Sequence, residues 1–339
     1  MAILVTGGAG YIGSHVCVSL LNAGFDVIIV DNFNNSYPEV LHRIENITGR
    51  TPINMPCDIR DRMMIEKILK NHGCTSVIHL AGLKAVAESA GCPLFYYDCN
   101  VVGTLILLQA MQSIRVKNLI FSSTAMVYGL PEYLPYDEKH PLVPENVYGR
   151  TKLIIEKMMA DLYTADPEWS FTILRYFNPV GAHESGLIGE DPKGIPNNLM
   201  PIISQVASGR RKKLTIWGDN YKTKDGTGIR DYIHVVDLAN GHIAALKMME
   251  KPGVHLFNLG CGKGFSVLDV IGAFEHVSNR PVPYIIGPRR PGDIAEFFTN
   301  SEMARKELGW EAKRDLHQIC ADMWNFQVKN PQGYRQKES

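Results

Sequence analysis

Short apolar runs alternate with amphipathic segments along the first half of the chain. Six runs rich in Val, Ile, Leu or Phe are typical of buried strands: residues 2–5, 26–30, 53–57, 76–80, 117–121 and 170–177. Four intervening segments space their apolar side chains at helical intervals: residues 15–21, 62–70, 96–113 and 152–159. Strands that alternate with helices predict a parallel, doubly wound α/β sheet.

The rhythm changes beyond residue 178, where Gly, Pro and Asn become frequent and the regular alternation ends. A helix through residues 199–207 and short strands at 214–218 and 254–259 still follow from the pattern. We therefore expect a large domain over 1–178 and a smaller mixed α/β domain over 179–339. The chain is expected to return to the large domain near 226–250.

A glycine-rich turn lies between the first strand and the first helix. Gly7, Gly10 and Gly13 are three residues apart in the sequence TGGAGYIGSH. Such a turn lets the backbone approach a pyrophosphate, and the helix N-terminus that follows favours negative charge. The placement predicts a Rossmann-type dinucleotide site. The alternative is a turn that only packs a helix against a sheet.

Polar and small residues follow several of the predicted strands. Asp31, at the end of the second strand, suits the hydroxyls of a ribose and would repel a 2′-phosphate, which favours NAD over NADP; a plain turn aspartate is the alternative. Asp58 suits an adenine amine, with Ile59 on the ring, but would equally cap the helix at 62–70. The carboxyl ends of parallel strands lie at the same edge of a sheet. We therefore expect these side chains and Thr124 to lie at that edge.

Tyr148 and Lys152 are four residues apart at the start of a predicted helix, so they share a face. A phenol titrates near pH ~10 in model peptides. A neighbouring ammonium and a cationic nicotinamide would both favour the phenolate, making Tyr148 a candidate proton acceptor. Alone, the pair would more often be a surface contact. Its position after the predicted strand ends favours a catalytic role.

A histidine and three arginines can each be interpreted as structural or as functional residues. His79 stands in a central strand, where a hydrogen-bonded core histidine is expected rather than a catalyst. Arg230, Arg289 and Arg290 are cations suited to a second pyrophosphate, and solvated surface arginines are the alternative.

Composition narrows the class of protein. The 339 residues carry 35 Lys and Arg against 35 Asp and Glu, so no basic excess points to nucleic acid or an anionic membrane. We expect no membrane-spanning run, no secretion leader and no metal site. The seven cysteines form no CxxC pair, so buried free thiols in a reducing cytoplasm are expected.

Several longer sequence motifs resemble those of a known protein family. TGGAGYIGSH, HLAGLKAV, FSST with YGRTK, and RYFNPVGAH resemble the extended short-chain dehydrogenase/reductase family. GEDPKGIPNNLMP, DGTGIRDYIHVVDLA and PGVHLFNLG are similar to its UDP-hexose 4-epimerases, and the match runs from the first strand to about Trp324. The resemblance implies interconversion of UDP-glucose and UDP-galactose with tightly bound NAD in a homodimer. Another NAD-dependent UDP-sugar enzyme, a dehydratase or decarboxylase, is the alternative.

The resemblance also assigns site residues. The catalytic set would be Thr124, Tyr148 and Lys152. Cofactor contacts would come from Gly7, Gly10, Tyr11, Ile12, Gly13, Asp31, Asn32, Asn35, Asp58, Ile59, Leu80, Ala81, Gly82, Lys84, Asn100, Tyr148, Lys152, Tyr176 and Phe177. The UDP-sugar would contact Thr124, Tyr148, Asn178, Asn198, Leu199, Thr215, Trp217, Arg230, Arg290, Asp293 and Phe297.

Three positions depart from the family pattern or refine it. Thr124 stands where close relatives often have serine, and it keeps the hydroxyl. Cys99 stands where some relatives carry asparagine, so Asn100 is the expected cofactor contact. Phe297 matches the position whose bulk gates the sugar pocket, and phenylalanine there disfavours N-acetylhexosamines.

Overall fold

Seven parallel strands form the central sheet of the computed structural model, which describes residues 1–339 except 195, 197, 291 and 336–339. Their order is β11-β6-β5-β4-β1-β2-β3, and each neighbouring pair runs parallel. The bounds are β1 Ala2–Thr6, β2 Asp26–Asp31, β3 Ile53–Pro56, β4 Cys74–His79, β5 Asn118–Thr124, β6 Ser170–Tyr176 and β11 Gly253–Leu259. The predicted doubly wound fold is confirmed.

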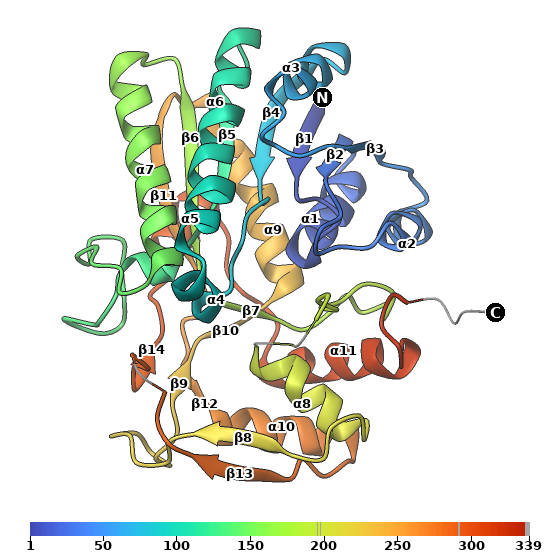
Figure 1. The fold of residues 1–339 in the computed structure, drawn as a ribbon, viewed down its shortest axis with the longest axis vertical. Helices are drawn as coiled ribbons and strands as arrows, with labels where there is room; N and C mark the ends of the chain where they lie inside the picture. Colours follow the sequence, from blue (N-terminus) through green and yellow to red (C-terminus); the bar gives the residue numbers. More distant parts are fainter. Residues whose placement is uncertain (195, 197, 291, 336–339) are drawn as a thin grey trace.

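Helices cover both faces of this sheet (Figure 1). Side chains alternate along a strand, so Ile3 and Val5 of β1 enter one core layer while Leu4 enters the other. The first layer lies under α1 (Tyr11–Asn22), α2 (Glu39–Thr48) and α9 (Val235–Ala245). The second lies under α3 (Arg62–Asn71), α6 (Gly103–Ile114) and α7 (Val147–Ala165). Both faces are apolar, which explains the continuous apolar runs in these strands.

One helical run, Pro93–Ile114, corrects an expectation. It comprises α5 (Pro93–Tyr96), the π-helical η1 (Tyr97–Val102) and α6. By length and composition alone it could cross a membrane, although no such run was expected. A buried core helix passes the same test, and 44% of its apolar window is buried. Leu107, Leu108 and Met111 pack in the sheet core.

A smaller lobe lies beneath the sheet in Figure 1. Its core joins α8 (Leu199–Ala207), α10 (Val267–Ser278) and α11 (Leu316–Lys329) to β8 (Leu214–Trp217). The remaining short strands are β7 Asn178–Val180, β9 Ile229–Arg230, β10 Tyr232–His234, β12 Phe265–Ser266, β13 Tyr284–Gly287 and β14 Glu296–Phe297. Parallel and antiparallel pairings both occur here, as a mixed lobe requires.

The chain returns to the large sheet after β10. α9 packs on α1, and η3 (Leu246–Glu250) leads into β11, which pairs with β6 along its whole length. The returning segment therefore extends to Leu259, past the expected 226–250. The apolar run at 254–259, expected within the small domain, is part of β11 in the large sheet, and its pairing partner β6 is far away in sequence.

Local details differ from the sequence expectations at several points. The helix at 62–70 is capped by Asp61, whose side chain accepts from the Met64 N–H at 3.0 Å, so the Asp58 cap was wrong. All seven cysteines are free, but only Cys17, Cys74 and Cys320 are buried.

Candidate active site

A cavity of about 500 Å³ opens at the carboxyl ends of β1, β2 and β4. Its lining contains most of the residues expected to contact a cofactor: Gly7, Gly10, Tyr11, Ile12, Gly13, Asp31, Asn32, Asn35, Asp58, Ile59, Leu80, Ala81, Gly82 and Lys84. Five other expected residues lie outside this lining: Asn100, Tyr148, Lys152, Tyr176 and Phe177. Most of the expected cofactor residues therefore do lie together at the carboxyl ends of the strands.

The glycine turn forms the floor of the cavity because no side chain fits there. Gly7 has a φ of +68°, and a Cβ on it would lie 2.8 Å from the Ala81 nitrogen. A Cβ on Gly13 would lie only 2.1 Å from the carbonyl oxygen of Gly7. α1 begins at Tyr11, directly after the turn, so its free N–H groups and positive dipole end face the cavity. This surface suits a pyrophosphate.

Asp31 fixes the loop after β2 to the glycine turn. Its Oδ2 accepts from the Ala9 N–H at 3.0 Å, and its Oδ1 accepts from the Phe33 N–H and the Ser36 hydroxyl at 2.9 and 2.8 Å. The residue is 9% exposed and lines the cavity. Asp31 therefore joins the loop after β2 to the glycine turn, which an aspartate that only stabilises its own turn would not do. Its position in the cavity lining suits the expected contact with a ribose.

Asp58 lines the same cavity beside Asn32, the residue after Asp31. It accepts from Asn32 Nδ2 at 3.0 Å and from the Arg60 side chain at 2.8 Å. Hydrogen bonds from Arg60 hold the pKa of this carboxyl well below its usual range. Asn32, Asp58 and Ile59 form one end of the cavity, where the sequence placed an adenine.

Asn100 acts beneath the cavity rather than in its wall. Its Oδ1 accepts from the Leu83 N–H at 2.8 Å, while its Nδ2 donates to the Leu83 carbonyl at 3.1 Å and to Thr151 Oγ1 at 3.1 Å. A Cβ on Gly82 would lie 3.0 Å from Asn100 Oδ1 and 3.7 Å from Lys152 Nζ. The asparagine thus joins the loop after β4 to α7.

Glu190 is a cavity residue that the sequence analysis missed. Its Oε1 accepts from Lys84 Nζ at 3.1 Å and from Asn198 Nδ2 at 2.8 Å. It therefore joins an expected cofactor contact to an expected substrate contact. Ser36, Tyr37 and Tyr334 also line the cavity unexpectedly. Glu190 is the second residue of the segment GEDPKGIPNNLMP, which carries part of the family resemblance. That segment is the feature of the sequence that could have pointed to Glu190.

Tyr148 lies in the first turn of α7, close to Thr124 at the end of β5. Burial raises the pKa of Tyr148 to about 12, while the Thr124 side chain lowers it. Burial is the larger of the two effects. The lowering of this pKa by a bound cationic nicotinamide stays a prediction.

Lys152 is one helical turn farther along α7. Its Nζ donates to the Ser122 carbonyl at 2.8 Å and lies 4.8 Å from the centre of the Phe121 ring. Burial lowers the pKa of Lys152 to about 8, while the charge of Glu156 raises it. Since Ser122 lines the cavity, this contact joins the lysine to the cavity wall.

Two aromatic residues expected beside the nicotinamide are core residues in this structure. The Tyr176 hydroxyl lies 2.5 Å from His242 Nε2, and burial raises the pKa of the phenol. Phe177 packs 5.2 Å from Phe297, measured between ring centres.

His79 is a buried core residue, as the sequence predicts. Its Nδ1 lies 2.7 Å from Thr6 Oγ1 and its Nε2 lies 2.9 Å from Thr104 Oγ1, and burial lowers its pKa to about 3. The core interpretation of His79 is confirmed.

A charged cluster marks the small lobe. Asp293 lies 2.8 Å from Arg290 Nε and 3.6 Å from Arg230 Nη2. Arg289 is turned elsewhere, since its Nε donates to Asn220 Oδ1 at 2.7 Å and its guanidinium lies 4.0 Å from the Tyr221 ring centre. The structure thus brings Arg230, Arg290 and Asp293 together and places Arg289 in a separate contact.

Short strands place the other expected substrate residues. Pairing of β14 with β9 sets Phe297 opposite Arg230, and Phe297 is 2% exposed against Tyr136 and Phe177. Thr215 and Trp217 lie two residues apart on β8, and Trp217 is exposed. Leu199 begins α8 directly after Asn198. Asn178 begins β7 and donates its N–H to the Asp231 carbonyl at 3.0 Å.

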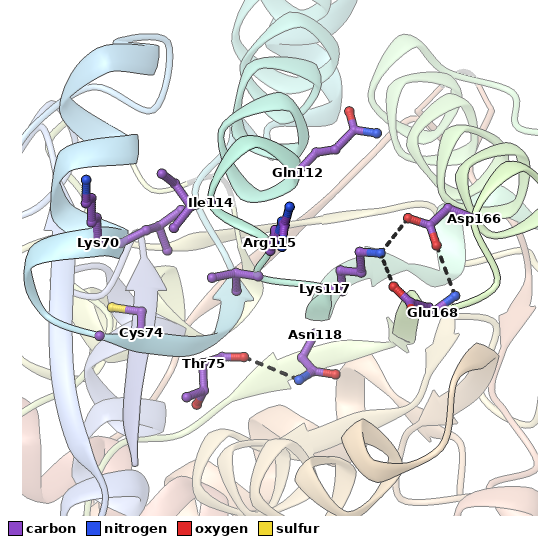
Figure 2. A pocket seen from close by; sticks show the side chains of 13 residues that line it. Lys70, Cys74, Thr75, Gln112, Ile114, Arg115, Lys117, Asn118, Asp166 and Glu168 are labelled. Carbon is purple, nitrogen blue, oxygen red and sulfur yellow. Dashed lines mark hydrogen bonds and ion pairs between the residues drawn. The ribbon is translucent and has the colours of Figure 1, made fainter.

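A second hollow, of about 980 Å³, lies at the opposite end of the sheet (Figure 2). It is lined by the amino ends of β4 and β5, and its Lys117 is paired with Asp166 and Glu168. Ligands of open parallel sheets bind at the carboxyl ends of the strands. The cavity beside the glycine turn is therefore the candidate active site.

Comparison with known proteins agrees with this geometry. A family model described as GDP-mannose 4,6 dehydratase matches residues 4–323. The UDP-glucose 4-epimerases of Yersinia pestis and Bacillus subtilis (strain 168) are 56% and 54% identical, covering 98% and 100% of this chain and 99% and 100% of their own.

Solved structures agree as well. The crystal structure of UDP-glucose 4-epimerase from Bifidobacterium longum in complex with NAD+ and UDP has a TM-score of 0.95 and 51% identity. It covers 98% of this chain and 100% of its own. The chain therefore belongs to the UDP-glucose 4-epimerase family, a branch of the larger family that the dehydratase model describes.

Proposed function

We propose that this protein interconverts UDP-glucose and UDP-galactose by inverting the configuration at C4 of the sugar. The observation that carries the proposal is that Tyr148 lies close to Thr124 at the end of β5, with the buried Lys152 one helical turn farther along α7. This group stands where β5 meets the dinucleotide-type cavity. A hydroxyl relay there can take a proton from a sugar hydroxyl and return it.

The residues of the cavity fit NAD. The bare glycine turn suits its pyrophosphate, the buried Asp31 carboxylate suits a ribose hydroxyl, and Asp58 with Ile59 suits the adenine. When bound, NAD accepts hydrogen from C4 and gives it back within one turnover. Because the cofactor is regenerated each cycle, tight retention is the proposed state, with Lys84 and Lys152 among its contacts.

Tyr148 is the proposed base, acting on the sugar 4-hydroxyl directly or through Thr124. The protein's own groups hold the pKa of Tyr148 at about 12, so a further positive charge is needed near neutral pH. A cationic nicotinamide bound in the cavity would supply that charge. Lys152 fixes the end of β5 through Ser122 and adds a second positive charge to the same region.

The small lobe is proposed to hold the UDP moiety. Arg230 and Arg290 supply cations for its pyrophosphate, with Asp293 orienting both. Asn178, Asn198, Leu199, Thr215 and Trp217 supply the other proposed contacts. The same proposal divides the chain into a lobe of residues 1–178 that binds NAD and a lobe of residues 179–339 that binds the UDP-sugar.

A dehydratase or decarboxylase of the same family is the competing function. Elimination of water needs an acid and a base beside the hydroxyl residue. The positions after Thr124 are Ala125 and Met126, and Ala125 is 1% exposed. The residues beside Thr124 therefore favour epimerisation over dehydration.

A homodimer is proposed from exposed apolar side chains on neighbouring helices. Leu94, Val102 and Leu105 of the Pro93–Ile114 run are 83%, 39% and 42% exposed, and Ile154 of α7 is 36% exposed. Contiguous apolar side chains on neighbouring helices are typical of an interface. We also propose a cytoplasmic location, which suits free cysteines.

Incubation of the purified protein with UDP-galactose and no added NAD tests the proposal. We expect UDP-glucose to form, because the cofactor remains bound and is regenerated. Net release of NADH would instead identify a dehydrogenase. Formation of a 4-keto-6-deoxy sugar would identify a dehydratase.

A further inference from the structure

Asp231 lies between β9 and β10 and is completely buried. Its Oδ1 accepts from the Cys261 N–H at 2.7 Å, and its Oδ2 accepts from the Gly262 and Thr299 N–H groups at 3.0 and 3.4 Å. The carboxylate thus binds two loops that are far apart in sequence.

The backbone of the same residue holds two residues proposed to contact the substrate. The Asp231 N–H donates to the Phe297 carbonyl at 3.0 Å, and the Asp231 carbonyl accepts from the Asn178 N–H at 3.0 Å. Arg230 precedes it and pairs with Phe297 across β9 and β14. Three proposed substrate residues are therefore attached to one peptide segment.

The packing around the carboxylate leaves no spare room. A Cβ on Gly260 would lie 2.6 Å from Asp231 Oδ2 and 2.4 Å from Thr299 Cγ2. Burial raises the pKa of Asp231 to about 6, and hydrogen bonds from the surrounding backbone lower it. A buried carboxylate is costly unless its oxygens are hydrogen-bonded, and here three N–H groups meet it.

We propose that Asp231 is a positioning residue of the substrate site, whose carboxylate sets the relative placement of Asn178, Arg230 and Phe297. The inference rests on the proposed function, because these three residues are assigned to the UDP-sugar there. Asp231 itself touches none of the reacting atoms. It acts through the segments that its carboxylate and backbone join.

A matched aspartate separates positioning from simple structural support. Asp237 on α9 is 2% exposed, and its Oδ2 accepts from the Lys313 and Arg314 N–H groups at 2.9 and 2.8 Å. Its carboxylate also pairs with the Arg314 side chain at 2.6 Å. Asp237 thus bridges backbone segments as Asp231 does, but none of its partners is a proposed substrate residue.

The test compares Asp231→Asn with Asp237→Asn. An amide keeps one acceptor and turns an NH₂ group toward a donor, so part of the bridge is lost in each variant. For Asp231→Asn we expect KM for UDP-galactose to rise about tenfold while kcat stays within about twofold. Retained NAD, measured by absorbance after denaturation, should match the wild type. Asp237→Asn should lower the melting temperature and leave KM unchanged.

Gly260→Ala provides a second variant, because its methyl group would displace the Asp231 carboxylate without altering it. The same rise in KM is expected. If Asp231→Asn does not fold, Gly260→Ala decides the matter. An unchanged KM in the folded variants, or a fall in kcat with KM unchanged, overturns the inference. A wild type that does not convert UDP-galactose overturns the proposed function instead.

Discussion

The Nζ of Lys152 lies 2.8 Å from the backbone carbonyl oxygen of Ser122, so a buried ammonium is attached to the carboxyl end of β5. Burial lowers the pKa of this lysine to about 8, below its ordinary value of 10.5. The folded protein therefore binds the lysine proton less tightly than the unfolded chain does.

This difference predicts how stability depends on pH. Between about pH 8 and 10.5 the unfolded chain keeps the proton that the folded Lys152 has released, so the lysine's contribution to the free energy of unfolding increases with pH there. Below about pH 8 both states are protonated and the burial penalty is full. Lys152→Met removes the titration. Denaturant unfolding of both proteins from pH 7 to 10 should show the variant's advantage shrinking with pH. An advantage that stays constant would contradict the lowered pKa.

Tyr148→Phe removes the proposed base and keeps the ring. We expect kcat to fall by about 10²–10⁴-fold, the usual contribution of a positioned acid–base group. Retained NAD should change little, because the variant keeps the aromatic ring and loses only the hydroxyl. Steady-state conversion of UDP-galactose measures the effect. Tyr163→Phe on the same helix is the control and should behave as wild type. Near-normal turnover by Tyr148→Phe would refute the base assignment.

Gly13→Ala tests the cofactor floor. The added Cβ would lie 2.1 Å from the Gly7 carbonyl oxygen and 2.8 Å from the Gly8 Cα, so the turn must open. We expect loss of most of the co-purified NAD, measured by absorbance. Gly272→Ala in α10 is the control, since among the residues that the structure describes no atom that its added methyl group could meet lies within 4 Å. It should raise stability by about 0.5–1 kcal/mol and keep NAD. Full NAD retention by Gly13→Ala would contradict the site.

Phe297→Ala tests the proposed gate. Phe297 packs 4.9 Å from Tyr136 and 5.2 Å from Phe177, so its removal opens space beside the proposed substrate residues. We expect turnover of UDP-N-acetylglucosamine to appear, with a stability loss of about 3–5 kcal/mol. Phe171→Ala, in the core of the large sheet, should lose similar stability without gaining this activity. If the Phe297 variant leaves the hexosamine unconverted, the gate is not this residue.

Local patterns in the sequence were sufficient for much of the site. The spacing of Gly7, Gly10 and Gly13 and the residues after β2 and β4 needed only strand periodicity and turn chemistry. Tyr148 and Lys152 could be paired from the sequence because both lie on one helix, α7. Each of these signals is contained within a short segment.

Features that depend on distant contacts were not predictable in this way. Glu190 pairs with Lys84, 106 residues away in the sequence, and Asp231 accepts from the Thr299 N–H through folding of the small lobe. β11 joins the sheet beside β6, far from it in sequence. The effect of burial on the pKa of Tyr148 could not be predicted from the sequence, because burial is a property of the packed structure.

Fate of the hydrogen on C4 is the most direct test of the central claim. UDP-galactose carrying deuterium at C4 would be converted in ordinary water, and the UDP-glucose formed would be examined by mass spectrometry and NMR. We predict that the deuterium is retained at C4 of the product, because hydrogen leaves that carbon and returns to it inside the site while Tyr148 handles only the hydroxyl proton. Replacement of the deuterium by solvent hydrogen would contradict the account.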